Sequence, residues 1–448
     1  MEKNGRIRRI ICVILAIAAS LGVYQLPLPG LEGSAKTMIF IFVLVAILWI
    51  TEAMPLYVTA FLVPILTAIT GILTPTASLA PFFDPVIALL LGGFILSISI
   101  NKYGLDKKFA MLVFSRMQNK PIILLITVMG ITAFFSMWFS NSATTIIMLA
   151  ILLPTIDRLP ENEPFARALI LSIPFAANIG GMGTPVGTTP NPIAISFLEK
   201  SGIKLTFIDW MAIAIPLQVL YLIGVILILL LFFRPKKKYI EITIEKLPKI
   251  GRQEKIVLFI FLLTVILWLT SKLHGVPDSI IALLPIILLN GMGFLDAEDF
   301  GKAKWDVLAL IAGGMALGIG MQKSGLDVWI VKQIKVGGLH PVLILMAFAA
   351  LAAIITTFMS NTATAALLIP VVGTFGVQFD MSTQMVFAVA IVSSAAMALP
   401  VSTPPNAIAY GTGRLKLQHM MVTGTLITLW SIIITSFIGN IWWSILGY

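Results

Sequence analysis

Two long stretches without a charged residue limit what this chain can fold into. Residues 121–156 and 336–379 contain no Asp, Glu, Lys or Arg, and each is about twice as long as the ~20 residues of one membrane-spanning helix. A cluster of short polar residues interrupts each stretch, SNS at 140–142 and SNT at 360–362. Such residues favour the start of a helix. We therefore expect two re-entrant helical hairpins with polar tips.

The composition is that of a membrane protein. Hydrophobic residues make up 58% of the 448 positions and charged residues 11%, against roughly 25% charged residues in soluble domains. No alternating strand pattern suggests a barrel. The net charge of +10 is expected in loops, where Lys and Arg hold the topology in the lipid bilayer, so no nucleic-acid partner is predicted. The single cysteine, Cys12, excludes an internal disulfide and a cysteine metal cluster.

We predict an all-α polytopic fold with 11 transmembrane helices plus the two hairpins. We expect the first of these helices to remain uncleaved, so it is not a signal peptide. Basic residues near the start place the N-terminus in the cytoplasm, and Tyr448 then lies outside. The expected spans are residues 7–26, 37–53, 57–73, 85–101, 165–198, 210–233, 256–270, 279–294, 307–322, 384–413 and 421–446. An interfacial amphipathic helix is expected between Lys107 and Arg116.

Four motifs recur in the same order, which indicates an internal duplication. The pairs are ILWIT at 47–51 with ILWLT at 266–270, GGF…NKYGLD at 92–106 with GGM…QKSGLD at 313–327, SNSAT at 140–144 with SNTAT at 360–364, and TTPNPIA at 188–194 with TPPNAIA at 403–409. Each copy holds five spans and one hairpin. An odd number of crossings inserts the second copy upside down, which gives two inverted repeats.

The duplication and a charged linker set the expected domain boundaries. Residues 1–36 form the first helix and its loop, and residues 234–255 form a cytoplasmic linker. Repeat 1 covers 37–233 with its hairpin at 121–157, and repeat 2 covers 256–448 with its hairpin at 341–377. The paired glycines 92–93 and 313–314 are expected to be positions of close helix packing.

A binding site is expected where the two repeats meet. Four breaks are available, the two hairpin tips and the loops at 183–191 and 402–406, and non-helical backbone at membrane depth is tolerated where it lines a cavity. Helix N-termini there attract anions, and freed carbonyl groups suit Na⁺. The hairpins and broken helices hold no charged residue or histidine at that depth, so we expect neutral dipoles to bind the ligands. The absence of a proton relay favours Na⁺ over proton coupling.

These motifs together resemble those of the divalent anion:sodium symporter family, which carries dicarboxylates, citrate or sulfate. The resemblance rests on the two hairpin motifs, the GGF and GGM elements and the two broken-helix motifs ending in PN, and it covers essentially the whole chain. It implies a homodimer with a scaffold domain and a transport domain that moves as an elevator.

The resemblance also implies residue roles. One Na⁺ site would use Ser136, Ser140, Asn141 and Gly187, and a second would use Thr356, Met359, Ser360, Asn361 and Ser402. The substrate carboxylates would contact Asn141, Ser142, Asn361, Thr362, Thr403 and Pro404. Ser142 stands where the family has threonine, and Thr189 where proline is usual, so the size and selectivity of the substrate stay open.

We therefore predict a secondary active transporter of the cell membrane, which couples Na⁺ to the symport of di- or tricarboxylates of the succinate, malate and fumarate class. No organic cofactor is expected. A Na⁺-independent dicarboxylate exchanger, a Na⁺/sulfate symporter and an arsenite efflux protein remain alternatives. A hydrolase using Ser140 or Ser360 would need a general base that the hairpins do not offer. Hairpins with opposite openings suit alternating access better than a channel.

Overall fold

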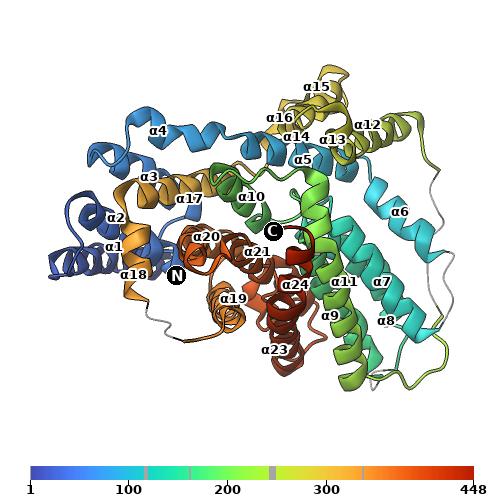
Figure 1. Ribbon diagram of the computed structural model, residues 1–448. Coiled ribbons are helices and arrows are strands. Elements are labelled where there is room, and N and C mark those ends of the chain that lie inside the picture. Colours follow the sequence, from blue (N-terminus) through green and yellow to red (C-terminus); the bar gives the residue numbers. More distant parts are fainter. Residues whose placement is uncertain (1, 116–119, 161–162, 242–248, 335–337) are drawn as a thin grey trace.

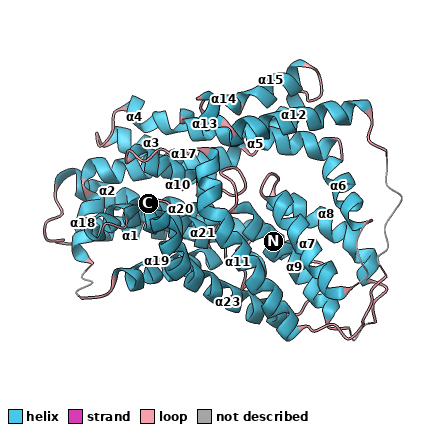
Figure 2. Cartoon of the chain, turned by 45° about the vertical axis from the view of Figure 1, so that its right-hand side comes forward, coloured by secondary structure: helices cyan, strands magenta, loops and turns pink. Residues whose placement is uncertain are grey.

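A computed structural model gives the arrangement of the helices. The structure describes residues 2–115, 120–160, 163–241, 249–334 and 338–448, so Arg116 and part of the predicted linker at 234–255 lie outside the described residues. Within these ranges the chain is helix and loop without strands (Figure 2). Seven described helical segments are long and apolar enough to cross a membrane: Gly33–Thr51, Pro75–Lys102, Phe207–Phe232, Ala297–Ser324, Pro341–Phe358, Asn361–Phe379 and Leu417–Ile445.

The helices follow one another along the chain as labelled in Figure 1. The first half holds α1 (Glu2–Gln25), α2 (Gly33–Thr51), α3 (Leu56–Ile69), α4 (Pro75–Leu79), α5 (Pro85–Lys102), α6 (Leu105–Phe114), α7 (Pro121–Ser136), α8 (Asn141–Ile156), α9 (Phe165–Gly181), α10 (Pro190–Lys200) and α11 (Phe207–Phe232). The second half holds α12 (Arg252–Leu269), α13 (Ser271–His274), α14 (Asp278–Ile281), α15 (Leu283–Gly291), α16 (Ala297–Gly301), α17 (Trp305–Ser324), α18 (Leu326–Gln333), α19 (Pro341–Phe358), α20 (Asn361–Gly376), α21 (Ser382–Ser393), α22 (Pro404–Tyr410), α23 (Leu417–Ile434) and α24 (Asn440–Ile445).

Both uncharged stretches fold as pairs of helices that break at the polar clusters. The pairs are α7 with α8 and α19 with α20, and the backbone turns to an extended conformation at Ser140 and Ser360 before the second helix of each pair. α7, α8 and α20 have 16 residues each, which is about 24 Å at 1.5 Å per residue. Such a helix is shorter than the ~30 Å hydrocarbon core.

Each hairpin packs on a broken helix of its own half and is completed by a helix from the other half. α7 and α8 pack against α9, while α19 and α20 pack against α21. α10, which follows α9, packs on α20 and α21, whereas α22, which follows α21, packs on α8 and α9. This exchange brings the broken ends of both halves together.

A second group of helices supports the hairpins from one side. α17 packs against α3 and α20, and α5 packs against α14 and α15 (Figure 1). Glycines allow this close approach: a Cβ on Gly313 would lie 2.5 Å from that of Ala60, and one on Gly92 would lie 2.2 Å from the carbonyl oxygen of Ala282.

The span expected at residues 279–294 is an apolar helical stretch, Asp278–Gly291, with a break inside it. The structure has two short helices there, α14 and α15, which are separated at Ala282. Pro285 has no N–H to donate to the carbonyl group of Ile281 four residues earlier, so the helical hydrogen bonding is interrupted at this point.

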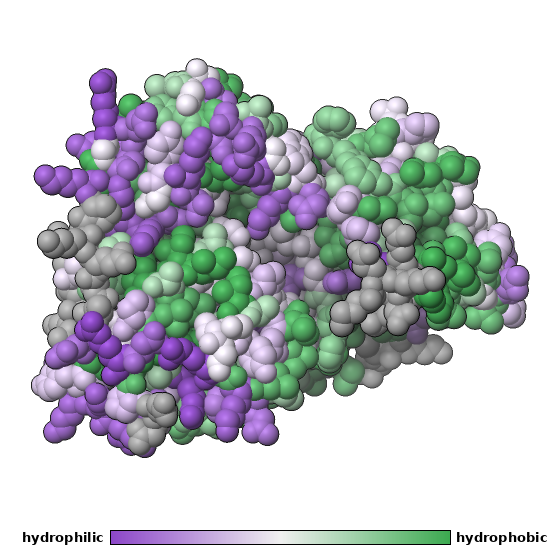
Figure 3. Space-filling model, turned by 180° about the vertical axis from the view of Figure 1, so that it is seen from behind, coloured by the Kyte–Doolittle hydropathy of each residue, from purple (hydrophilic) through white to green (hydrophobic). Residues whose placement is uncertain are grey.

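The surface agrees with a membrane setting. Large apolar side chains are exposed along the long helices, among them Leu227 and Leu231 of α11 and Phe259 of α12. On the left-hand part of the face in Figure 3, a band of hydrophobic residues lies between two margins of hydrophilic ones. Lipid is the solvent that such a band requires.

Candidate functional site

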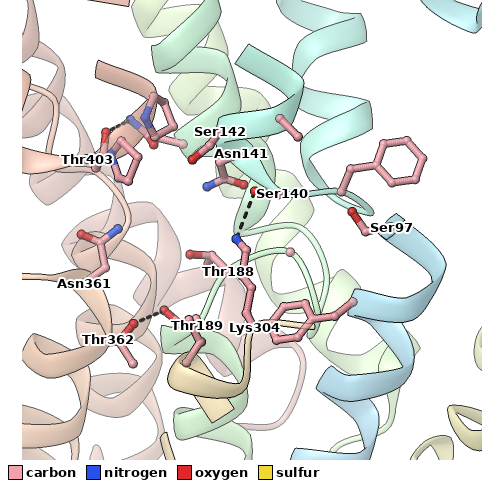
Figure 4. Close-up of a pocket in the computed structure, with 18 of the residues that line it drawn as sticks. Ser97, Ser140, Asn141, Ser142, Thr188, Thr189, Lys304, Asn361, Thr362 and Thr403 are labelled. Atoms are coloured by element: carbon pink, nitrogen blue, oxygen red, sulfur yellow. Dashed lines mark hydrogen bonds between the residues drawn. The ribbon is translucent and has the colours of Figure 1, made fainter. Parts of the chain in front are cut away.

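A pocket of about 940 Å³ lies where the hairpin tips and the broken helices meet. Its lining includes residues from both halves of the chain, and Figure 4 shows Asn141 and Ser142 on one side and Asn361 and Thr362 on the other. All six predicted substrate contacts line this pocket: Asn141, Ser142, Asn361, Thr362, Thr403 and Pro404.

Three oxygen atoms converge beneath the first hairpin tip. The buried Ser136 hydroxyl is 2.6 Å from Asn141 Oδ1 and 2.7 Å from the carbonyl oxygen of Ala177. The hydroxyl has one proton, so in this arrangement it can donate to only one of the two oxygens. The cluster therefore offers oxygen atoms to which a cation could bind.

The first loop closes on the same cluster. The glycines Gly181 and Gly187 approach so closely that a Cβ on Gly187 would lie 2.5 Å from the carbonyl oxygen of Gly181. A Cβ on Gly181 would lie 3.0 Å from Asn141 Oδ1 and 3.0 Å from the carbonyl oxygen of Gly187. The structure therefore brings the predicted ligands Ser136, Asn141 and Gly187 together, with Ser140 at the tip above them.

The second hairpin repeats the arrangement. The buried Thr356 hydroxyl is 2.7 Å from Asn361 Oδ1 and 2.8 Å from the carbonyl oxygen of Ser393. Again one proton serves two acceptors. Of the other predicted ligands, Met359, Ser360 and Ser402 line the pocket. Ser402 donates its hydroxyl proton to the carbonyl oxygen of Thr357, at 2.9 Å.

Asparagines hold the unwound loops in place. Asn191 donates to the carbonyl oxygens of Gly181 and Thr184, at 3.0 and 2.7 Å. Asn406 donates to that of Leu399, at 3.0 Å. Both are fully buried. In the sequence they stand out as the PN of each broken-helix motif, but that pattern does not reveal which carbonyl groups they bind.

Two residues that were not among the predicted site residues connect the two halves of the chain. Asn178 of α9 donates to the Thr403 hydroxyl at 3.0 Å and to Asn406 Oδ1 at 3.1 Å. The hydroxyl groups of Thr189 and Thr362 lie 2.5 Å apart and share a hydrogen bond (Figure 4). Thr189 is one of the two departures from the family pattern, so this position supplies a polar contact that proline could not make.

Neutral side chains are not the only ones that line the pocket. Among the residues that the structure describes, five charged ones line the pocket: Glu52, Lys102, Asp299, Lys302 and Lys304. None belongs to a hairpin or a broken helix. They come from α2, α5 and the segment around α16, whose side chains reach the cavity because these helices pack beside it. Only the tertiary structure shows that approach.

Comparison with known proteins gives a consistent picture. The family model described as the sodium:sulfate symporter transmembrane region matches residues 8–448. An uncharacterized transporter of Haemophilus influenzae is 32% identical over 434 residues, which cover 92% of this chain and 93% of the relative. The sodium-dependent dicarboxylate transporter SdcS of Staphylococcus saprophyticus is 32% identical over 428 residues, covering 87% of this chain and 82% of that protein.

Two solved transporters share the fold. The YdaH transporter of Alcanivorax borkumensis superposes with a TM-score of 0.62 at 14% identity, over 98% of both chains. MtrF of Neisseria gonorrhoeae superposes with a TM-score of 0.55 at 13% identity, over 96% of this chain and 94% of MtrF. At such identities the likeness concerns the fold alone.

Proposed function

Since this chain belongs to the sodium:sulfate symporter family, a family of membrane transporters and not of enzymes, we propose that it is a Na⁺-coupled symporter of di- or tricarboxylates of the succinate, malate and fumarate class. The sodium-dependent dicarboxylate transporters among its relatives support Na⁺ as the coupling ion and a dicarboxylate as the substrate.

One observation carries the proposal. Two clusters of oxygen atoms, around Ser136 and around Thr356, stand at matching places beneath the two hairpin tips, and each holds one proton for two acceptors. Oxygen ligands of this kind suit a hard cation. Two Na⁺ ions bound there would place positive charge beside Asn141 and Asn361, which line the pocket. The anion would then bind between amide and hydroxyl groups that are backed by cations.

Alternating exposure of this pocket follows from the proposed fold. Eleven spans and two hairpins in inverted repeats would let the hairpins and broken helices move as a transport domain. The group built on α3, α5 and α17 would remain as the scaffold of a homodimer. The protein would lie in the cell membrane with its N-terminus in the cytoplasm and its C-terminus outside.

Uptake into proteoliposomes tests the function. Labelled succinate should accumulate with an inward Na⁺ gradient and not when choline replaces Na⁺. Equal uptake in choline, together with counterflow, would support a Na⁺-independent exchanger instead. Competition by unlabelled C4-dicarboxylates, citrate and sulfate ranks the substrates, and a preference for sulfate would identify a Na⁺/sulfate symporter.

The tip asparagines provide the matching variants. Asn141→Ala and Asn361→Ala should each abolish uptake, because each removes an amide that lines the pocket and an oxygen from a cation cluster. Elution of the purified variants as the wild-type oligomer controls for folding. Normal uptake by both variants would mean that the substrate binds elsewhere.

A further inference from the structure

Lys304 reaches into the pocket from outside the hairpins and broken helices. It directly precedes α17, and its Nζ donates to the Ser140 hydroxyl at 3.1 Å. Figure 4 shows the side chain running past Thr188 towards the tip of the first hairpin. The ring centroid of Phe94 lies 5.9 Å from Nζ, within the range of a cation–π contact. The ammonium group is thus held at the tip of the first hairpin, inside the pocket.

Lys304 forms no close ion pair, unlike the other two lysines of the pocket, and the carboxylate of Asp306 attracts its charge only from a greater distance. Lys102 forms an ion pair with Asp299, and Lys302 lies 3.0 Å from Asp299 and 3.2 Å from Glu298. Among the residues that the structure describes, no carboxylate oxygen lies within 4.0 Å of Lys304 Nζ. An unpaired charge in a concave, partly apolar pocket is costly unless a ligand of opposite charge joins it.

The two repeats differ at this point. Ser360 accepts a hydrogen bond from the backbone N–H of Ala363 and so caps α20. Ser140 makes no such cap on α8 and accepts from Lys304 instead. The 221-residue offset between Gly92 and Gly313 places Phe83 opposite Lys304 in the first repeat. The position opposite Lys304 in the first repeat therefore carries no positive charge.

We propose that Lys304 binds the transported anion directly and supplies the fixed positive charge that the hairpin tips lack. When the anion enters, the ammonium group exchanges the Ser140 hydroxyl for a carboxylate oxygen, and the charge-assisted hydrogen bond favours dianions over monoanions. Ser140 is then free to contribute to the neighbouring cation cluster. This inference rests on the proposed function, because it names a contact with the substrate of that site.

Substitution of the lysine separates anion binding from Na⁺ binding. In proteoliposomes, Lys304→Gln should raise the KM for succinate about tenfold or more, the effect of one lost charge-assisted hydrogen bond, and leave the half-saturating Na⁺ concentration within about twofold. Lys304→Arg should keep most of the affinity. Lys272→Gln is the matched control, since this lysine is paired with Asp209 and is not part of the pocket lining. If Lys304→Gln does not fold, Lys304→Met replaces it.

Thermal unfolding of the purified protein gives a second readout. Succinate, citrate or sulfate added in NaCl should raise the Tm of the wild type through binding to the folded state. Lys304→Gln should keep the rise caused by NaCl and lose the rise caused by the anion. If the anion raises the Tm of Lys304→Gln as much as that of the wild type, this inference is overturned and the proposed function still stands. An altered Na⁺ dependence with an unchanged succinate KM overturns it as well. A wild type that neither accumulates nor is stabilised by any of the three anions overturns the proposed function and this inference together.

Discussion

Single hydroxyl groups decide whether the proposed cation sites can form. Ser136 and Thr356 each stand five residues before the tip asparagine, and each also reaches a carbonyl oxygen of the adjacent broken helix. A hydroxyl in mid-helix usually bonds to its own helix four residues back, as Thr132 does to the carbonyl oxygen of Val128. Ser136 and Thr356 depart from this habit, and they stand at matching positions of the two hairpins.

Removing either hydroxyl should weaken Na⁺ coupling. Ser136→Ala and Thr356→Val each delete one oxygen ligand to a charged ion, worth about 1.5 kcal/mol, so the Na⁺ concentration for half-maximal uptake should rise about tenfold. The measurement is initial succinate uptake against Na⁺ concentration. Thr132 carries a buried hydroxyl on the same helix as Ser136. Thr132→Val should change the Na⁺ concentration for half-maximal uptake less than twofold. Unchanged Na⁺ curves in both ligand variants would place the cations elsewhere.

Each half of the chain contains a short helix that directly follows a glycine in the left-handed backbone conformation. Gly104 and Gly325 have φ of +60° and +76°, and each is followed by a helix that begins at the next residue, α6 or α18. A buried aspartate stands at the second position of each helix. Asp106 accepts from Asn101 Nδ2 at 3.2 Å, and Asp327 accepts from the Thr374 hydroxyl at 2.9 Å. Burial raises the pKa of Asp106, the largest effect on that carboxyl group.

These turns should not tolerate a side chain. Gly325→Ala should lower the free energy of unfolding by about 1 kcal/mol, because a left-handed conformation costs that much for a residue with a Cβ. No atom lies within 4 Å of the added Cβ, so the cost is one of backbone strain. Thermal denaturation of the purified protein measures it.

The control for this variant lies on α7. Gly130 is a helical glycine with open space around its Cβ position and no positive φ. Gly130→Ala should therefore stabilise the protein by up to about 1 kcal/mol. Equal destabilisation by both substitutions would show that added volume, and not the backbone conformation, is responsible.

At the scale of the whole molecule, the pocket lies between two groups of helices. The hairpins and broken helices provide its polar residues, and α5 together with the segment before α17 provides Gly93, Phe94 and Lys304. If the first group moves against the second, as we propose, contacts such as that of Lys304 with Ser140 must break and reform in each cycle. A contact between the groups can therefore be used to arrest transport.

A reversible cross-link tests this movement. A Cβ on Gly93 would lie 3.0 Å from that of Val186 in the first broken loop, so a small outward shift of this loop would reach the ~3.8 Å typical of a disulfide. With Cys12→Ser as background, Gly93→Cys combined with Val186→Cys should cross-link under oxidation. Succinate uptake should then stop and return after reduction. The two single-cysteine variants should be insensitive to oxidant. Full uptake by the cross-linked protein would contradict an elevator movement between these parts.

The sequence by itself determined the helical class, the breaks at the two polar clusters and the duplicated motifs, because these depend on local composition. Long uncharged runs favour helices in lipid, and short polar residues and proline favour the start of a new helix. The tertiary structure decided which breaks meet. It showed the exchange of α10 and α22 between the halves and the bond between Thr189 and Thr362. It also brought a lysine from a neighbouring segment into the pocket between the uncharged hairpins. Contacts between residues more than 150 positions apart depend on how the helices pack, and no local pattern records that packing.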